Sequence, residues 1–338
     1  MSNSSQDFPI TIFPWQYGSW QQLWESKQKH KLAHALLLVG MDGLGKSQFA
    51  YELAAALLCR EPSGWGVRCG KCHGCCMMTA KSHPDFMVVE PAETGKKISV
   101  DQVRDVIKNV NETTLKGGFR VIIISPATSM NVNAANALLK TLEEPAPNTL
   151  LMLVSNAGLR LPATIISRCQ QVAFSKPHHA DAIAWLQKKI SDEKVNPQLL
   201  LKLADGAPLK ALALLESDVI SLRQGLYQDI YSLSQGQADP LQLAAKWQDG
   251  DPINIVDLLL SWLTDILRFK VTQDPVDLLN LDYKTEITRT GINLLPNNLF
   301  VYIDYLQQAR SDLMRAINLN KQLLLETLFI RWTDYVSG

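Results

Sequence analysis

Two patterns of apolar and polar positions alternate along the first half of the chain. Short runs dominated by apolar residues occupy positions 35–39, 86–89, 119–124 and 149–154, and such runs predict buried strands. Between them, apolar residues recur at intervals of three and four positions and predict helices at 47–58, 99–110 and 131–144. A last strand is expected to end near residue 174. The alternation predicts a parallel sheet with helices on its faces and a ligand site at the carboxyl ends of the strands.

The second half of the chain is dominated by helical spacing. Residues 178–220 contain three groups of leucine, isoleucine and alanine, which predict three short helices. Apolar residues then recur at three- and four-residue intervals over 255–269 and over 298–335, where they predict one broad helical stripe. We predict three domains, with an α/β domain at 1–176, an all-α domain at 177–221 and a second all-α domain at 222–338.

A glycine-rich turn joins the first strand to the helix that follows it. Its residues, Gly40-Met41-Asp42-Gly43-Leu44-Gly45-Lys46-Ser47, fit the P-loop pattern G-x-x-x-x-G-K-[ST] at every fixed position. In this pattern backbone N–H groups converge on phosphate oxygens, the lysine binds the outer phosphates, and the hydroxyl binds Mg²⁺. The alternative is a loop that keeps the shape without the chemistry. The predicted ligands are ATP and Mg²⁺, and the predicted binding residues are Gly40, Gly43, Gly45, Lys46 and Ser47.

The strand at 119–124 lacks the acidic residues that nucleotide hydrolysis requires. A hydrolysing P-loop protein places a carboxylate at the end of a nearby strand to hold the metal, and a further group orients the attacking water. Here the strand is followed by Ser125 and Pro126. We therefore expect a chain that is able to bind a nucleotide but has no ATPase activity of its own.

Five of the six cysteines lie in one short insertion, at positions 59, 69, 72, 75 and 76. Four thiolates at this spacing suit a tetrahedral Zn²⁺ of the closed, structural type, and neighbouring glycines permit the tight turns around a metal. A reducing cytosol disfavours disulfides, and the lack of a redox motif nearby disfavours an iron–sulfur cluster. We predict a structural zinc site in the insertion 59–76 with Cys59, Cys69, Cys72 and Cys75 as ligands, any of which Cys76 or His73 is able to replace.

Composition and charge exclude some classes of function. The chain has 33 Lys and Arg against 33 Asp and Glu among its 338 residues, so it shows no global basic footprint of a nucleic-acid-binding protein, although a local patch remains compatible with these numbers. The first residues lack the basic region and apolar core of a signal peptide, and no apolar run approaches the ~18 residues of a membrane span. We expect a cytoplasmic protein with no membrane partner.

Four features together resemble a known family. They are the P-loop, the four-cysteine insertion, the segment 136–145 (Asn-Ala-Leu-Leu-Lys-Thr-Leu-Glu-Glu-Pro) and the tripeptide Ser167-Arg168-Cys169. Over about residues 32–175 this combination is similar to the bacterial clamp-loader subunits of the AAA+ class. The resemblance implies an α/β P-loop AAA+ domain with a zinc-binding insertion, followed by an all-α lid and an all-α collar through which subunits form a ring.

Two departures make the chain more similar to the non-motor members of that family. The motor subunits, called gamma/tau, carry two acids where this chain has Ser125 and Pro126, and an arginine where an ungapped comparison places Leu209. The alternative is an ATP-hydrolysing motor subunit or a DNA-dependent P-loop ATPase. A turnover assay on the isolated chain would separate these two hypotheses.

The resemblance also implies a site residue and a set of partners. Arg168 would act in trans as an arginine finger, facing an ATP held by a neighbouring subunit. The implied partners are the gamma/tau and delta subunits in a hetero-pentamer, the sliding clamp, and primed DNA through the complex. The expected function is therefore to supply this arginine and to help load the sliding clamp on primed DNA.

Overall fold

A computed structural model describes residues 12–93, 96–110, 118–156, 161–191, 195–216, 219–274, 278–314 and 320–336. The chain divides into two compact units, Met1–His178 and His179–Gly338. Each unit has a hydrophobic core of its own. The finer division into three domains, with a boundary at 221, stays a prediction.

Within the described residues, the first unit contains a parallel sheet of five strands in the order β2-β3-β4-β1-β5. The strands are β1 (Ala35–Gly40), β2 (Phe86–Val89), β3 (Arg120–Ile124), β4 (Thr149–Asn156) and β5 (Gln170–Phe174). They agree with the strands predicted from the apolar runs. Gly40 at the end of β1 lies opposite Asn156 of β4 and Phe174 of β5, so three strand ends meet beside the turn that follows β1.

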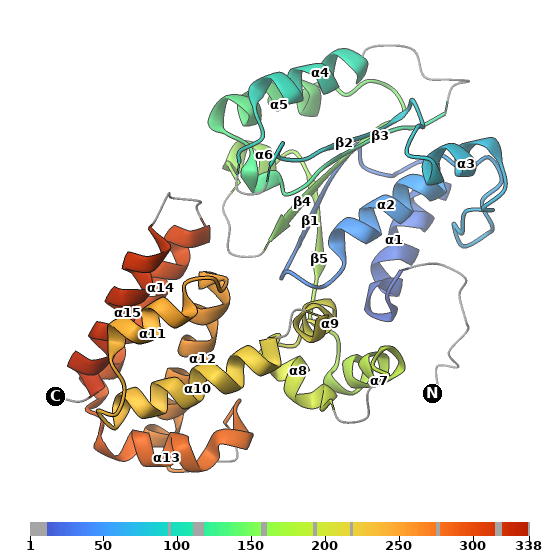
Figure 1. The fold of residues 1–338 in the computed structure, drawn as a ribbon. Helices are drawn as coiled ribbons and strands as arrows, with labels where there is room; N and C mark the ends of the chain where they lie inside the picture. The colour runs from blue at the N-terminus through green and yellow to red at the C-terminus, as the bar shows by residue number, and fades with distance from the viewer. Residues whose placement is uncertain are drawn as a thin grey trace. The chain divides into compact units, whose positions relative to one another are not determined.

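Helices cover both faces of this sheet, as Figure 1 shows. One face carries α4 (Val100–Val110), α5 (Val132–Glu143) and α6 (Ala163–Ile166), and the other carries α1 (Tyr17–Gln28) and α2 (Lys46–Leu57). Ala35 and Leu37 of β1 belong to the core beneath α4, α5 and α6. Leu36 and Leu38 point to the opposite face because side chains alternate along a strand, and they are equally buried.

Local sequence signals account for the helix starts. The N–H of Gln102 donates to Ser99 Oγ at 3.3 Å, and the N–H of Ser99 donates to Gln102 Oε1 at 3.0 Å, so a capping box starts α4. At the start of α5, Asn131 Oδ1 accepts a hydrogen bond from the N–H of Ala134 at 2.7 Å. These caps fix the two helices that lie over the sheet.

The second unit is helical throughout its described residues. Its first part consists of α7 (His179–Lys189), α8 (Pro197–Leu203) and α9 (Pro208–Glu216), as predicted for this region, and these helices share a small core. The larger part contains a separate core formed by α10 (Val219–Ser234), α11 (Pro240–Trp247), α12 (Pro252–Thr272), α13 (Lys284–Asn293), α14 (Pro296–Met314) and α15 (Lys321–Val336). The apolar stripe over 298–335 is therefore shared by two helices, α14 and α15, whose pattern alone did not reveal the break.

A buried polar network fixes the segment before α13 onto α12. Asp265 is fully buried and accepts hydrogen bonds from the N–H groups of Leu279 at 2.8 Å and Asn280 at 2.7 Å. The side chain of Asn280 in turn accepts from the Arg223 guanidinium, and Arg223 also binds Asp282 at 2.6 Å. Each buried charge in the network has partners, which is the condition for burying it without a large penalty.

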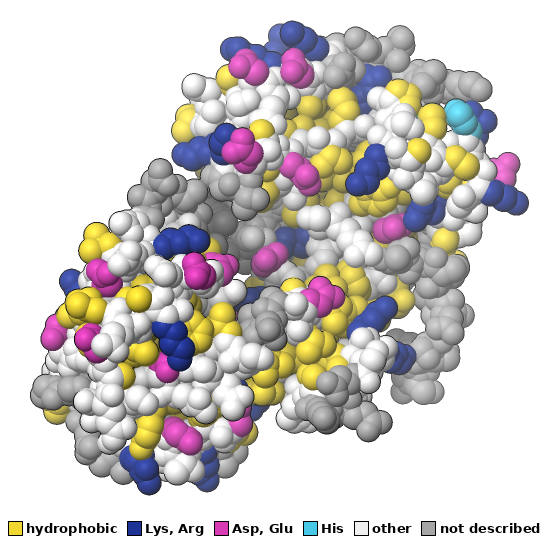
Figure 2. All heavy atoms as spheres, in the orientation of Figure 1, with side chains coloured by type: hydrophobic (Ala, Val, Ile, Leu, Met, Phe, Trp, Pro, Cys, Tyr) yellow, Lys and Arg dark blue, Asp and Glu magenta, His cyan; other side chains and the backbone are white. Residues whose placement is uncertain are grey.

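The surface carries charges of both signs. Figure 2 shows Lys and Arg side chains interspersed with Asp and Glu on the face in view, in keeping with equal numbers of the two in the sequence. Within the described residues, no helix has the length and hydrophobicity needed to cross a membrane.

Candidate functional site

The P-loop follows β1 and has the backbone conformation that its glycines permit. Gly43 and Gly45 have φ angles of 77° and 80°, in the left-handed region that favours glycine, and Gly45 is the N-cap of α2. At Gly40, an added Cβ would lie 2.6 Å from the carbonyl oxygen of Phe174, so the close approach of β5 also requires glycine. The first N–H groups of α2 have no acceptor within the helix, and they provide the donors that an anion would use.

Lys46 and Ser47 already have partners within the protein. Lys46 is only 4% exposed, and its Nζ donates to the carbonyl oxygen of Met41 at 2.6 Å. Burial lowers the pKa of Lys46, while the nearby Asp42 carboxylate opposes this shift. The Ser47 hydroxyl lies 3.2 Å from the Ser125 hydroxyl, directly after β3. The side chain that faces the P-loop serine at this point is thus a neutral hydroxyl.

Residues 13–16, which precede α1, form hydrogen bonds and packing contacts with the P-loop. The Trp15 indole donates to the carbonyl oxygen of Leu44 at 3.0 Å. The Gln16 side chain is fully buried and donates to the carbonyl oxygens of Leu44 at 2.9 Å and Gly45 at 3.0 Å. The ring of Phe13 packs so closely on Gly45 that an added Cβ there would lie 2.4 Å from it. Nothing in the sequence pattern indicated that Trp15 and Gln16, which lie 29 and 28 positions before Leu44, would form hydrogen bonds with this loop.

The insertion brings four cysteine sulfurs together. The Sγ atoms of Cys59, Cys69, Cys72 and Cys75 all lie within 4.8 Å of one another. Cys59 to Cys72 and Cys69 to Cys75 are both 3.9 Å apart, close to the ~3.8 Å edge of a tetrahedron with Zn–S bonds of ~2.3 Å. These separations are about twice the S–S bond length of ~2.05 Å, and all four cysteines are free thiols. The set of ligands that the spacing predicted is therefore the set that converges here, while Cys76 is exposed and bonds to Lys71.

The surroundings of the sulfurs shift the four thiol pKa values in different directions, lowering those of Cys69 and Cys72 and raising those of Cys59 and Cys75. Backbone N–H groups of the cluster donate to the sulfurs of Cys59, Cys69 and Cys72 at 3.2–3.5 Å. Burial works against ionisation of Cys72, but backbone hydrogen bonds from Arg60 and Cys75 lower its pKa to about 6. Burial raises the pKa of Cys75. Four thiolates in such proximity repel one another, so a bound cation is the condition under which all four ionise.

The insertion is packed firmly on the sheet domain. Trp20 and Trp24 of α1 donate through their indole N–H groups to the carbonyl oxygens of Trp65 at 2.9 Å and Gly64 at 3.1 Å. The short helix α3 (His73–Thr79) has Cys72 as its N-cap, and an added Cβ at Gly74 would lie 2.4 Å from the carbonyl oxygen of Leu58. This helix was not predicted from the sequence, because seven residues rich in cysteine and glycine carry no helical periodicity.

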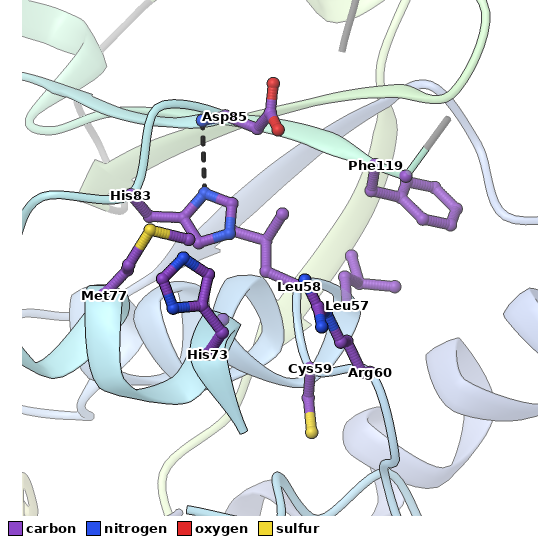
Figure 3. A pocket seen from close by; sticks show the side chains of 11 residues that line it. Leu57, Leu58, Cys59, Arg60, His73, Met77, His83, Asp85 and Phe119 are labelled. Atoms are coloured by element: carbon purple, nitrogen blue, oxygen red, sulfur yellow. Dashed lines mark hydrogen bonds between the residues drawn. The ribbon is translucent and has the colours of Figure 1, made fainter. Parts of the chain in front are cut away.

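A cavity of about 310 Å³ lies between the insertion and the sheet, and Figure 3 shows the side chains around it. Its wall includes His83, whose Nδ1 accepts the N–H of Asp85 at 3.1 Å. Asp85 forms an ion pair with Arg120 at 3.1 Å, and both side chains are 5% exposed. The segment His83-Pro84-Asp85 therefore has a structural role at the start of β2.

Arg168 lies between α6 and β5, at the surface of the first unit. Its guanidinium donates to the carbonyl oxygen of Thr164 at 2.9 Å and to Glu143 Oε1 at 2.5 Å, and its side chain is 35% exposed. None of its hydrogen bonds among the described residues goes to the P-loop or to the cysteines. The next residue, Cys169, is partly buried, and burial raises its pKa to about 11, which keeps the thiol protonated and unreactive.

A P-loop after β1 of a parallel sheet, together with a helical second unit, defines a P-loop α/β protein of the AAA+ class. Sequence comparison narrows this class. Residues 15–178 match the family described as "DNA polymerase III, delta subunit", and residues 217–334 match its C-terminal counterpart.

The relatives agree with this assignment. The protein called DNA polymerase III subunit delta' of Pseudomonas aeruginosa is 39% identical over 324 residues, 96% of this chain and 98% of that one. Its counterpart in Escherichia coli is 32% identical over 328 residues, 96% of each chain. The chain belongs to the DNA polymerase III delta' family. A solved structure of a DNA polymerase III gamma subunit-related protein from Thermotoga maritima is 18% identical, with a TM-score of 0.41 over 95% of this chain and 99% of that one.

Proposed function

We propose that this chain is the non-motor delta' subunit of the clamp loader of DNA polymerase III, acting in the cytoplasm. In this role it assembles with gamma/tau and delta subunits in a hetero-pentamer and helps to load the sliding clamp on primed DNA. The names of its relatives support a place in the polymerase III assembly. The assignment of a non-motor role rests on the geometry of the P-loop.

The observation that carries this proposal is the contact between Ser47 and Ser125. The two hydroxyls are 3.2 Å apart, and no carboxylate of the described residues forms a hydrogen bond with either of them. A motor subunit needs a carboxylate near this point to hold Mg²⁺ and a group that orients water. A pair of hydroxyls provides no negative charge to hold Mg²⁺ and no charged group to orient water. The chain is therefore expected to contribute to ATP hydrolysis in the complex without hydrolysing ATP itself.

Arg168 provides such a contribution. An arginine supplied in trans stabilises the negative charge that develops on the transferred phosphoryl group, and isolated fingers are worth on the order of 10³–10⁵ in rate. The guanidinium of Arg168 is partly exposed and is held at the surface, which suits a residue that acts on a neighbouring subunit. In a ring with several ATP sites, removing Arg168 should lower the total hydrolysis rate by less than this factor, because only one site loses its arginine.

The test is to rebuild the complex with Arg168→Ala and measure its ATPase and clamp-loading rates. The variant should assemble normally but slow both rates, whereas Arg104→Ala, which removes a more exposed arginine on α4, should leave them unchanged. Unchanged hydrolysis and loading in Arg168→Ala would refute the finger. Failure of the variant to assemble would instead assign Arg168 a structural role.

The complete P-loop favours one alternative, an ATP-hydrolysing motor subunit or a DNA-dependent ATPase. Gly43 and Gly45 have the left-handed φ angles that the turn needs, and among the hydrogen bonds of the described residues Ser47 Oγ is bonded to a hydroxyl that Mg²⁺ could displace. The isolated chain separates the two hypotheses. Robust ATP turnover by wild-type protein that is lost in Lys46→Ala would establish the motor and refute the non-motor assignment.

We further propose that the four cysteines hold one Zn²⁺ with a structural role. Their separations fit the tetrahedral edge, and four protein ligands leave no open coordination position for chemistry. When bound, the ion supplies the charge that lets four adjacent thiolates coexist. The chain's own residues contribute the backbone N–H donors to the sulfurs and the tryptophans of α1 that pack the insertion onto the sheet domain.

A further inference from the structure

The Arg168 guanidinium is held by two different parts of the first unit. Nη1 donates to the carbonyl oxygen of Thr164, the second residue of α6, and lies 3.4 Å from the Ser167 hydroxyl. The other terminal nitrogen donates to Glu143 Oε1 at 2.5 Å. The bonds within the segment 164–168 are local, whereas Glu143 is 25 positions earlier in the chain. Glu143 is therefore the contact that ties Arg168 to another element of the fold.

Glu143 is well placed to fix a position in space. It is the last residue of α5, a helix whose start is capped by Asn131 and whose inner face buries Leu138 and Leu142 completely or nearly so. A carboxylate at the end of such a helix has a position set by the core. The side chains of Glu143 and Arg168 are nevertheless 51% and 35% exposed, so their mutual contact is open to solvent and is not required to fill the core.

We propose that Glu143 is a positioning residue for Arg168, which orients the guanidinium toward the ATP site of the neighbouring subunit. This inference rests on the proposed function of Arg168. The contact with Glu143 uses one hydrogen of Arg168 Nη2, and Nη1 donates to Thr164 and Ser167. Among the hydrogen bonds of the described residues, the Nε–H and the second Nη2 hydrogen are not used. These two donors are the ones that remain for a phosphate.

A long arginine side chain at a surface otherwise samples many rotamers, and ordering it costs free energy at the moment it is needed. A carboxylate that holds one edge of the guanidinium places the other edge in a fixed direction before ATP is bound. The glutamate also has an effect that would slow hydrolysis, because its negative charge partly cancels the positive charge of the arginine. Orientation and cancellation predict opposite changes in rate when the carboxylate is removed.

The experiment is a set of substitutions in the reconstituted clamp loader, read as kcat and KM for ATP. Glu143→Ala should slow hydrolysis at the affected site by about two- to fivefold, the range expected for one exposed charged contact, so it should lower the kcat of the complex by less than Arg168→Ala does, with KM unchanged. Glu143→Gln keeps an oxygen acceptor at the same distance and should retain most of the rate. Glu143→Asp keeps the charge but withdraws the oxygens by one methylene, and it should be slower than Glu143→Gln. Glu144→Ala removes a neighbouring exposed carboxylate and should have no effect.

A double substitution links the two residues. Adding Glu143→Ala to Arg168→Ala should change nothing further, because the glutamate acts only through the arginine. A rate that is equal or higher in Glu143→Ala, or lower in Glu143→Gln than in Glu143→Asp, would overturn the positioning role. Should Glu143→Ala fail to assemble, the order of the Gln and Asp variants still decides the question. An unaffected rate in Arg168→Ala alone would refute the proposed function and not this inference specifically.

Discussion

Replacing Gln16 with alanine would test whether the segment before α1 maintains the P-loop. Gln16 is fully buried, and its side chain makes three hydrogen bonds: its amide donates to Leu44 and Gly45 at 2.9 and 3.0 Å, and its oxygen accepts the N–H of Phe13 at 3.1 Å. Alanine removes all three bonds and leaves a small void. Among the described residues, the Trp15 indole keeps its hydrogen bond to the P-loop backbone, and the Phe13 ring keeps its packing on Gly45.

The loss of stability in Gln16→Ala can be estimated from the backbone groups that keep a hydrogen-bond partner. The carbonyl oxygen of Leu44 keeps the Trp15 donor at 3.0 Å, and that of Gly45 keeps the N–H of Phe49 at 2.9 Å, so neither becomes unsatisfied. The N–H of Phe13 loses its acceptor, at a cost of about 1–3 kcal/mol, and the net loss of the other bonds adds about 1 kcal/mol. We expect a total of about 2–4 kcal/mol, which is a roughly 30- to 900-fold increase in the opening equilibrium of this region.

The measurement is urea unfolding of the first unit combined with hydrogen–deuterium exchange of the peptide covering residues 40–50. Gln16→Ala should lower the unfolding midpoint and speed exchange in this peptide, while Gln22→Ala, an exposed glutamine on α1, should match wild type in both. Midpoint and exchange rates indistinguishable from wild type in Gln16→Ala would show that the P-loop holds its conformation without this contact.

Three further predictions concern the metal, the P-loop and a buried ion pair. Cys72→Ser should release zinc, measured by elemental analysis, and loosen the insertion while the sheet stays folded; wild-type protein purified without chelator and found free of zinc would refute the site. Lys46→Ala should abolish any nucleotide binding seen by calorimetry but alter clamp loading only modestly, and a complete loss of loading would contradict the non-motor role. Asp85→Ala removes the carboxylate that pairs with the buried Arg120 guanidinium and should destabilise the first unit by about 3 kcal/mol in urea unfolding, compared with no measurable change for Asp101→Ala, whose ion pair is exposed.

Signals confined to neighbouring residues were predictable from the sequence. The capping box of Ser99 and Gln102 and the N-cap Asn131 depend on contacts three residues apart, and both helices begin where these residues place them. Strands β1, β3 and β4 were predictable from the sequence because a run of β-branched and leucine residues is buried on both faces of a parallel sheet. The cysteine cluster was predictable because metal ligands recur at short spacing.

Contacts between distant side chains were not predictable in this way. Gln16 to Leu44 and Arg168 to Glu143 join residues 28 and 25 positions apart, and a single glutamine or glutamate carries no periodic signal of its partner. The division of the stripe at 298–335 into α14 and α15 was missed for a related reason. Apolar spacing continues across both helices because both pack on one core, so periodicity alone does not mark where the chain turns.

The hydrogen bond from Lys46 to Met41 gives the P-loop lysine a task that is independent of any nucleotide. A buried ammonium group that satisfies a loop carbonyl is costly to replace, so selection for folding alone would keep this lysine through generations that never bound ATP. The same holds for Gly43 and Gly45, which a left-handed backbone requires. The P-loop residues are therefore expected to serve the fold whether or not Ser47 and Ser125 take part in nucleotide chemistry.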